Sequence, residues 1–320
     1  MKYFEIPARN RETIRMSRII LGGAPFGTKV SKEQSFEMMD RFIAQGGNTI
    51  DTARVYCDWL ENGHSVSERT IGEWMKARNN RKDVVMITKG GHPDSSGRNR
   101  LSREEILRDM DTSLRTLQTD YVDLYLLHRD DTSLPVSVIM DTLHILTEEG
   151  KARAVGVSNW SCDRIAEANE YAAGKGKTKI SISQIQWSFA QCLPEHFEDK
   201  TLICMNQSEY EKYLKLNIPV TAFSSQANGL FSKAGEEGLE HVPDKLKKFV
   251  TPENIRRYNN LLKLCKDRGY SKSAVSLGYI TDNRLNAAAV IGCTSMEQLE
   301  DSLKAAGISL SQQDIDSLLS

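Results

Sequence analysis

Apolar residues fall into two kinds of segment along this chain. Short, mainly apolar runs such as 121–128 have the length and composition of buried strands. Longer runs carry apolar residues at helical spacing, as Ile71, Trp74 and Met75 do within 67–78. Strands are therefore predicted at 18–23, 48–51, 83–89, 121–128, 152–158, 179–186, 218–223 and 287–292, and a helix is predicted after each of them.

Several of the predicted helices have start signals. Ser31 is placed to cap a helix over 31–45, and Ser102 with Glu105 has the spacing of a capping box. Pro135 is suited to the first turn of the next helix. The remaining helices are predicted over 67–78, 161–173, 207–216, 253–268, 272–281 and 295–306, with a hairpin before residue 18 and a short helix at the end of the chain.

Regular alternation of strand and helix predicts a parallel sheet. Eight such units in 320 residues favour a closed (β/α)8 TIM barrel, formed as a single domain over residues 1–320. An open doubly wound sheet would need a Gly-x-Gly-x-x-Gly turn after the first strand, which 21–27 does not supply. The glycine-rich, charged segment 233–252 is predicted as a long, irregular loop insertion after the seventh strand.

Composition excludes several classes of protein. The net charge is −1 with both signs interspersed, so neither a nucleic-acid partner nor a membrane surface is expected. No stretch approaches the ~18 apolar residues of a membrane-spanning helix, and no signal-peptide pattern opens the chain, so a cytoplasmic location is expected. Six cysteines without a C-x-x-C pair predict reduced thiols, with neither a disulfide framework nor a metal site.

Ionisable residues end three successive predicted strands. Asp51, Lys89 and His128 occupy these positions, and Tyr56 follows five residues after Asp51. The carboxyl ends of barrel strands meet at one rim, where the active sites of such barrels lie. A phenol has a pKa near ~10, so a catalytic tyrosine needs a neighbouring cation. The pattern predicts an active site at this rim.

Three motifs resemble the aldo-keto reductase family over about residues 16–306. They are the segment 49–56 with Ser67-Glu68 and Ile71-Gly72 downstream, the segment 123–128, and the segment 150–159. The resemblance implies that Tyr56 is a general acid, that Lys89 lowers its pKa, that Asp51 pairs with Lys89, and that His128 orients a carbonyl. An ammonium ~4 Å from a phenolate is worth roughly 4 kcal/mol at an effective dielectric of ~20, so the pKa of Tyr56 is expected to move towards neutrality.

The same resemblance implies a nicotinamide cofactor, NADP with NAD not excluded. Ser158, Asn159 and Gln184 match the residues that bind the carboxamide, and Phe223 matches the aromatic residue that stacks on the ring. The other matching positions are Gly23, Asp51, Ser224, Ser225, Ala227, Gly229, Lys233, Gly292, Thr294, Gln298 and Asp301. No Arg or Lys occurs within 291–303, where many members clamp the 2′-phosphate. The lysines of 233–252 are consistent with a cofactor lid or with a solvated charge run.

The implied activity is carbonyl–alcohol interconversion on a small-molecule substrate, with a hydroxylated, sugar-like carbonyl as one candidate. The alternative is a cofactor-sensing regulatory subunit, like the potassium-channel β subunits that share this fold, which binds dinucleotide and turns over little. Cys57 is expected to line the substrate pocket, and Trp59 either to line it or to pack in the core. The histidines at 64, 92, 144, 196 and 241 match no motif and are expected to be structural or on the surface. The oligomeric state is not indicated.

Overall fold

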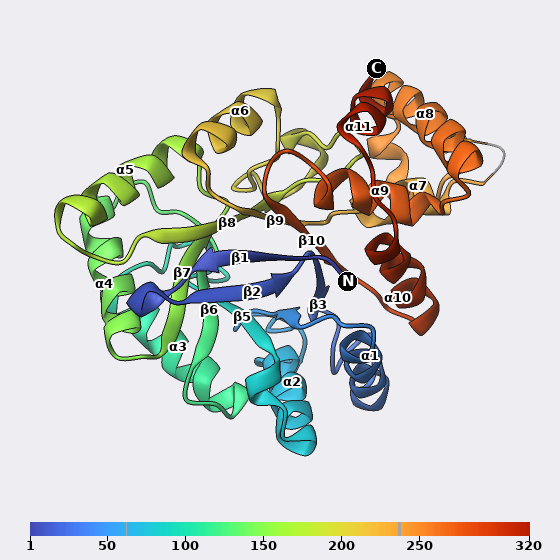
Figure 1. Ribbon diagram of the computed structural model, residues 1–320. Coiled ribbons are helices and arrows are strands. Elements are labelled where there is room, and N and C mark those ends of the chain that lie inside the picture. Colours follow the sequence, from blue (N-terminus) through green and yellow to red (C-terminus); the bar gives the residue numbers. More distant parts are fainter. Residues whose placement is uncertain (62, 236–237) are drawn as a thin grey trace.

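A computed structural model describes residues 1–61, 63–235 and 238–320, so residue 62 and residues 236–237 of the predicted insertion lie outside the described residues (Figure 1). Eight parallel strands close into a barrel in the order β10-β3-β4-β5-β6-β7-β8-β9. The strands are β3 (Ile19–Gly22), β4 (Thr49–Asp51), β5 (Val85–Gly90), β6 (Val122–Leu127), β7 (Ala152–Ser158), β8 (Ile180–Gln186), β9 (Val220–Phe223) and β10 (Ala287–Ile291). This architecture confirms the predicted (β/α)8 barrel.

Helices surround the barrel, as Figure 1 shows. They are α1 (Lys32–Ala44), α2 (Val66–Arg78), α3 (Arg103–Leu117), α4 (Val136–Glu148), α5 (Cys162–Gly174), α6 (Gln207–Leu216), α7 (Leu230–Lys233), α8 (Pro252–Arg268), α9 (Lys272–Thr281), α10 (Met296–Leu303) and α11 (Gln312–Leu319). Ser31 caps α1 as predicted and also forms a capping box with Gln34, and Ser102 forms the predicted capping box with Glu105. The predicted strand at 83 begins later, because Arg81–Asp83 forms a 3-10 turn.

An antiparallel hairpin closes the amino end of the barrel. It consists of β1 (Tyr3–Pro7) and β2 (Thr13–Ser17) and crosses the barrel in Figure 1. Its inner face packs against the inward-facing residues of the barrel strands, and this cluster includes Phe4, Ile6, Ile14, Met16, Ile20, Ile87, Leu124, Leu126 and Ile182. This apolar cluster forms the floor of the barrel. The polar groups inside the barrel therefore lie at its carboxyl end, the rim.

Alternation along each strand carries the same inward face from the floor to the rim. In β5, Val85 and Ile87 belong to the floor cluster, so Lys89, two residues further on, also points inward. In β6, Leu124 and Leu126 belong to that cluster, and His128 follows with the same parity. The sequence thus changes from apolar to ionisable along one face of each strand.

The segment after β9 is more ordered than an irregular insertion. Helix α7 and two 3-10 turns, Leu239–His241 and Asp244–Phe249, occupy its described part. Phe231, Leu246 and Phe249 are buried, and the Phe231 ring stacks on Tyr258 with centroids 5.7 Å apart. The predicted long insertion after the seventh strand is therefore present, and apolar residues spaced among its charges dock it on α8.

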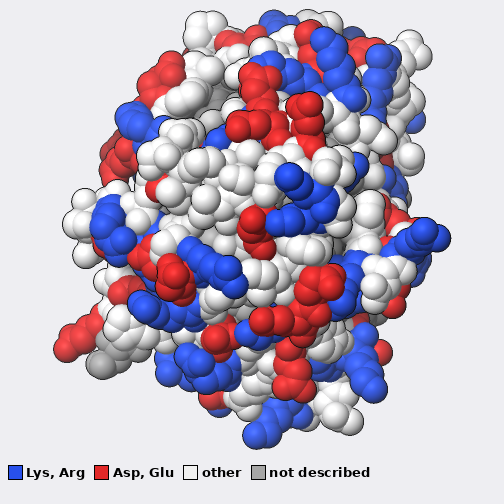
Figure 2. Space-filling view, turned by 90° about the vertical axis from the view of Figure 1, so that its left-hand side faces the viewer, with Lys and Arg blue, Asp and Glu red and all other residues white. Residues whose placement is uncertain are grey.

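The surface carries no obvious field of one sign on the face shown in Figure 2, where acidic and basic side chains are interspersed. Within the described ranges, no helix is both long enough and apolar enough to cross a membrane.

Candidate active site

Lys89 is the buried centre of the rim. Its side chain is fully enclosed, and Nζ donates to Asp51 Oδ1 at 2.6 Å, to the Thr52 carbonyl oxygen at 2.8 Å and to the Tyr56 hydroxyl at 3.1 Å. Burial alone would lower the pKa of Lys89, but Asp51 and Tyr56 outweigh that effect and raise it. Lys89 is therefore a fixed ammonium whose three protons all have acceptors.

Tyr56 does not have the electrostatics that the sequence predicted. Burial raises its pKa, the Lys89 ammonium opposes that rise, and the Asp51 carboxylate adds to it. The net shift is upward, so the expectation of a pKa nearer neutrality was wrong. The prediction counted the attraction of Lys89 but neither the desolvation of the phenolate nor the cancelling charge of Asp51. At neutral pH the phenol keeps its proton.

His128 faces Tyr56 across the mouth, with ring centroids 5.8 Å apart and nearly perpendicular planes. Burial lowers the pKa of His128 well below its usual range, and the cations Lys89 and Arg129 lower it further. The imidazole is therefore neutral at physiological pH. Its Nδ1 atom is buried and has no hydrogen-bond partner among the residues that the structure describes.

Two residues at this end of the site lay outside the predicted set. The His92 ring packs edge-on against His128 at 4.9 Å, although no motif singled it out. Arg129 lines the cavity, and its guanidinium donates to Asp199 at 2.6 Å and to Thr201 at 2.8 Å, which ties the β8–α6 connection to the rim. The position of Arg129 directly after His128 was the only signal that could have found it.

A cavity of about 1450 Å³ opens above these residues. Tyr56 and His128 line it together with most of the predicted cofactor residues, namely Asp51, Ser158, Asn159, Gln184, Phe223, Ser224, Ser225, Gly229, Lys233, Gly292, Thr294, Gln298 and Asp301. Gly23 and Ala227 do not line it. A Cβ on Gly23 would meet Ile71 at 2.9 Å, and Ala227 is buried beneath the loop, whereas Gly22 reaches the wall.

Amide side chains connect the cavity wall to the catalytic candidates. Gln184 Nε2 donates to Asp51 Oδ2 at 2.9 Å, so both oxygens of that carboxylate have partners. Asn159 Nδ2 donates to Ser158 Oγ at 3.0 Å, and Asn159 Oδ1 accepts from the backbone amide of Ile203 at 3.1 Å. These bonds orient the amides towards the cavity mouth before any ligand binds.

Lysines of the segment after β9 line the far part of the cavity. Lys233, Lys245 and Lys248 lie on its wall, whereas Lys247 does not and pairs with Asp244 at 2.7 Å. Partial burial and the neighbouring Lys245 ammonium lower the pKa of Lys233. Cations that line the same part of a cavity favour an anionic ligand there.

Residues 291–303, where the family resemblance places the 2′-phosphate, and their surroundings are mixed in charge. Thr294 and Ser295 precede α10, and the Thr294 amide is held by Gln298 Oε1 at 2.9 Å. Glu300 pairs with Arg41, and Asp301 pairs with Lys304 at 3.1 Å. Arg41 and Lys304 are thus already paired with acids, whereas Lys29 joins the lysines described above as a cation on the cavity wall.

The loop after β4 departs from one further expectation. Trp59 is 71% exposed and contributes neither to the core nor to the cavity wall. Cys57 is buried, with Sγ donating to the Ala24 carbonyl at 3.4 Å, and it does not line the cavity either.

Comparison with known proteins adds an independent finding. The family model described as "Aldo/keto reductase family" matches residues 18–320. A putative aryl-alcohol dehydrogenase of Saccharomyces cerevisiae is 31% identical, covering 95% of this chain and 83% of the relative, and norsolorinic acid reductase of Emericella nidulans is 30% identical, covering 94% and 77%. The crystal structure of the thermostable aldo-keto reductase Tm1743 in complex with the inhibitor epalrestat superposes with a TM-score of 0.74, at 24% identity, over 99% of this chain and 98% of that one. The chain belongs to the aldo/keto reductase family and is an oxidoreductase of carbonyls and alcohols.

Proposed function

We propose that the chain reduces a small-molecule carbonyl to an alcohol with NADP(H), using Tyr56 as the general acid. The main observation in support is that one enclosed ammonium, Lys89, contacts both Asp51 and the Tyr56 hydroxyl at the mouth of a large cavity. A reduced nicotinamide, when bound, would supply hydride to the carbonyl carbon. The phenol would donate its proton to the oxygen.

The proton donor suits the reduction direction. Because the pKa of Tyr56 is raised, the phenol is fully protonated at neutral pH. When it gives up its proton, the growing phenolate charge lies 3.1 Å from the Lys89 ammonium, so the attraction increases as the proton leaves. Neutral His128 can donate a hydrogen bond to the same carbonyl oxygen and hold it near the phenol.

The cavity fits a dinucleotide in size and in chemistry. Pockets for drug-sized ligands occupy roughly 300–1,000 Å³, so about 1450 Å³ leaves room for a dinucleotide and a substrate. Ser158, Asn159 and Gln184 offer donors and acceptors for a carboxamide, and Phe223 offers a flat face. The like-charged pair of Lys233 and Lys245 would hold phosphates, and Lys248 adds a third cation, which supports NADP over NAD.

The proposal also covers the class of substrate and the cellular location of the protein. Relatives named for aryl alcohols and norsolorinic acid favour an aromatic carbonyl, and the mouth offers the rings of Tyr56 and His128. Loops give no independent support for a sugar-like substrate. All six cysteines are unpaired, which supports a reducing, cytoplasmic compartment.

The test is a panel of aromatic aldehydes, ketones and aldoses, assayed with NADPH and with NADH. We expect carbonyl-dependent NADPH oxidation, fastest with an aromatic aldehyde, and a loss of about 10²- to 10⁴-fold in kcat for Tyr56→Phe with dinucleotide affinity retained. Tight dinucleotide binding without turnover of any carbonyl or alcohol would instead support a regulatory subunit. Wild-type kcat in Tyr56→Phe would refute the assigned acid.

A further inference from the structure

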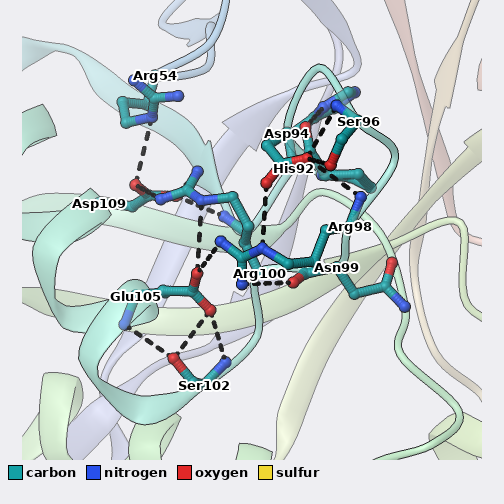
Figure 3. Close-up of polar contacts among 12 residues, drawn as sticks. Arg54, His92, Asp94, Ser96, Arg98, Asn99, Arg100, Ser102, Glu105 and Asp109 are labelled. Atoms are coloured by element: carbon teal, nitrogen blue, oxygen red, sulfur yellow. Dashed lines mark hydrogen bonds and ion pairs between the residues drawn. The ribbon is translucent and has the colours of Figure 1, made fainter.

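Asp109 is a buried carboxylate outside the predicted site. It lies on α3, is 2% exposed, and has partners in the loop that carries Tyr56 and at both ends of the β5–α3 loop. Oδ2 accepts from the Gly91 backbone amide at 2.9 Å, Oδ1 accepts from Arg100 at 2.9 Å, and Oδ1 lies 3.3 Å from Arg54 Nε. Figure 3 shows Arg54 and Arg100 converging on this carboxylate. A charged group so enclosed costs desolvation energy that its partners must offset.

The first partner leads to the proposed acid. Arg54 lies two residues before Tyr56, and its backbone amide donates to the Lys89 carbonyl at 3.0 Å. Its side chain spans Asp109 and Asp58, with Nη1 3.0 Å from Asp58 Oδ2. The loop that carries Tyr56 is therefore fixed at its backbone to β5 and at its side chain to α3.

The second partner leads to the imidazole side of the mouth. Gly91 adopts φ +70°, and its amide points to Asp109. The residue before it, Gly90, accepts from the His128 amide at 2.8 Å, and the residue after it, His92, packs its ring on His128. Moving Gly91 would therefore displace the contacts that Gly90, at the end of β5, and His92 make with His128.

Further ion pairs brace the loop beyond His92. Arg98 donates to Asp94 at 3.1 Å and to Glu105 at 2.9 Å, and Glu105 closes the capping box of α3 on Ser102 (Figure 3). The two ends of this loop are thus tied to one helix, and Asp109 is the member of the network that also reaches the Tyr56 loop.

We propose that Asp109 is a positioning residue that holds the Tyr56 loop and the His92 loop in register, and so sets the distance between the phenol, the Lys89 ammonium and the His128 ring. Asp109 touches neither the cavity nor the proposed reacting atoms, so its effect passes through Arg54 and Gly91. The inference rests on the proposed function, because it concerns the geometry of the proposed acid. A displacement of about 1 Å at such a site can cost about 100-fold in rate.

The chain offers a matched control in Asp123, another carboxylate that is 2% exposed. It accepts from the Met86 backbone amide at 2.9 Å, from Arg81 at 3.0 Å and from Arg153 at 2.8 Å, so it too binds one amide and two arginines. It lies at the start of β6, at the floor of the barrel. Asp109→Asn and Asp123→Asn therefore remove the same charge from similar surroundings at opposite ends.

The experiment measures kcat, dinucleotide affinity by fluorescence, unfolding temperature, and the ring signals of the histidines by NMR. With six histidines in the chain, His92 and His128 can be assigned by single substitutions. For Asp109→Asn we expect kcat to fall about 10- to 100-fold with dinucleotide affinity unchanged and the His92 and His128 signals shifted. For Asp123→Asn we expect a lower unfolding temperature, wild-type kcat and wild-type signals.

Two results would overturn the proposal: an Asp109→Asn variant with wild-type kcat and wild-type histidine signals, or an equal loss of kcat in Asp123→Asn. If Asp109→Asn does not fold, Asp109→Glu decides, since it keeps the charge but shifts the carboxylate; slower turnover with intact dinucleotide binding supports the proposal, and wild-type kcat overturns it. If the wild-type chain turns over no carbonyl or alcohol, the proposed function fails, while the histidine signals still decide whether Asp109 positions the two loops.

Discussion

The two ends of the barrel use similar charged groups for different purposes. At the floor, Asp123 joins Arg81 and Arg153 beneath an apolar cluster, and its partners belong to the starts of neighbouring strands. At the rim, Asp51 holds Lys89, whose ammonium contacts the Tyr56 hydroxyl, and Asp109 holds Arg54, which lies two residues before Tyr56. The three carboxylates are equally buried, since Asp51, Asp109 and Asp123 are each 2% exposed. The pairs differ in which segments they connect. The position of a pair within the fold, rather than its chemistry, therefore decides whether removing the pair affects stability or rate.

The strongest contrast comes from removing one cation at each end. Lys89→Met should lower kcat for carbonyl reduction by about 10²- to 10⁴-fold, because the phenolate formed at Tyr56 loses the ammonium 3.1 Å away. Steady-state kinetics measures the loss, and fluorescence titration should show that dinucleotide still binds. A variant within tenfold of the wild-type kcat would remove Lys89 from the proposed mechanism.

The matching change at the floor is Arg81→Met. Arg81 donates to Asp123, to Thr119 and to the carbonyls of Val84 and Tyr121, so its loss leaves a buried carboxylate short of a partner. We expect the free energy of unfolding to fall by about 3 kcal/mol, with kcat unchanged. Urea unfolding tests the expected loss of stability, and steady-state kinetics tests whether kcat is unchanged. A loss of kcat in the folded variant would contradict the division between the ends.

A third change concerns pH. Burial raises the pKa of Glu68 to about 7 from an ordinary 4.5, and its Oε1 accepts from Thr88 at 2.6 Å close beneath the rim. The folded state therefore holds this proton more tightly than the unfolded state. The contribution of Glu68 to stability is fully present below about pH 4.5 and is lost as pH rises through about 7, a change on the order of 3 kcal/mol.

Glu68→Gln removes the titrating group and keeps its size. Unfolding free energies measured across this range should show the wild-type chain losing stability relative to the variant as pH rises. A difference between the two proteins that stays constant from pH 4.5 to 7 would show that Glu68 does not titrate as its burial indicates.

The sequence predicted the residues at the rim better than the residues that hold them in place. Lys89 and His128 were recognisable because strand alternation places the ionisable residue on the same face as the apolar residues before it. Asp109 carried no such signal, because an acidic residue on an amphipathic helix normally marks its solvated face. Asp109 is buried because α3 packs against two loops. The spacing of residues along one helix does not predict that packing.

Electrostatics was the other part beyond reach of the sequence. The direction of the shift at Tyr56 depends on how much water the phenol loses and on the second charge at Asp51, and both are properties of the packed rim. The packing of the segment after β9 was not predicted, for a related reason. Its lysines dominated the pattern, whereas Phe231 and Phe249, which anchor it, have no regular spacing.

The smallest expected effect separates the lysines of that segment. Lys245 lines the cavity beside Lys233, whereas Lys247 lies off the wall and pairs with Asp244. Lys245→Ala should weaken NADPH binding by about tenfold, roughly 1.4 kcal/mol, and NADH binding less, because NADPH carries an additional phosphate for the cation to attract. Lys247→Ala, the matched control, should bind both dinucleotides as the wild-type chain does. Equal affinities in the two variants would mean that Lys245 is a solvated surface charge. The rim charges that affect function would then be confined to the groups around Lys89.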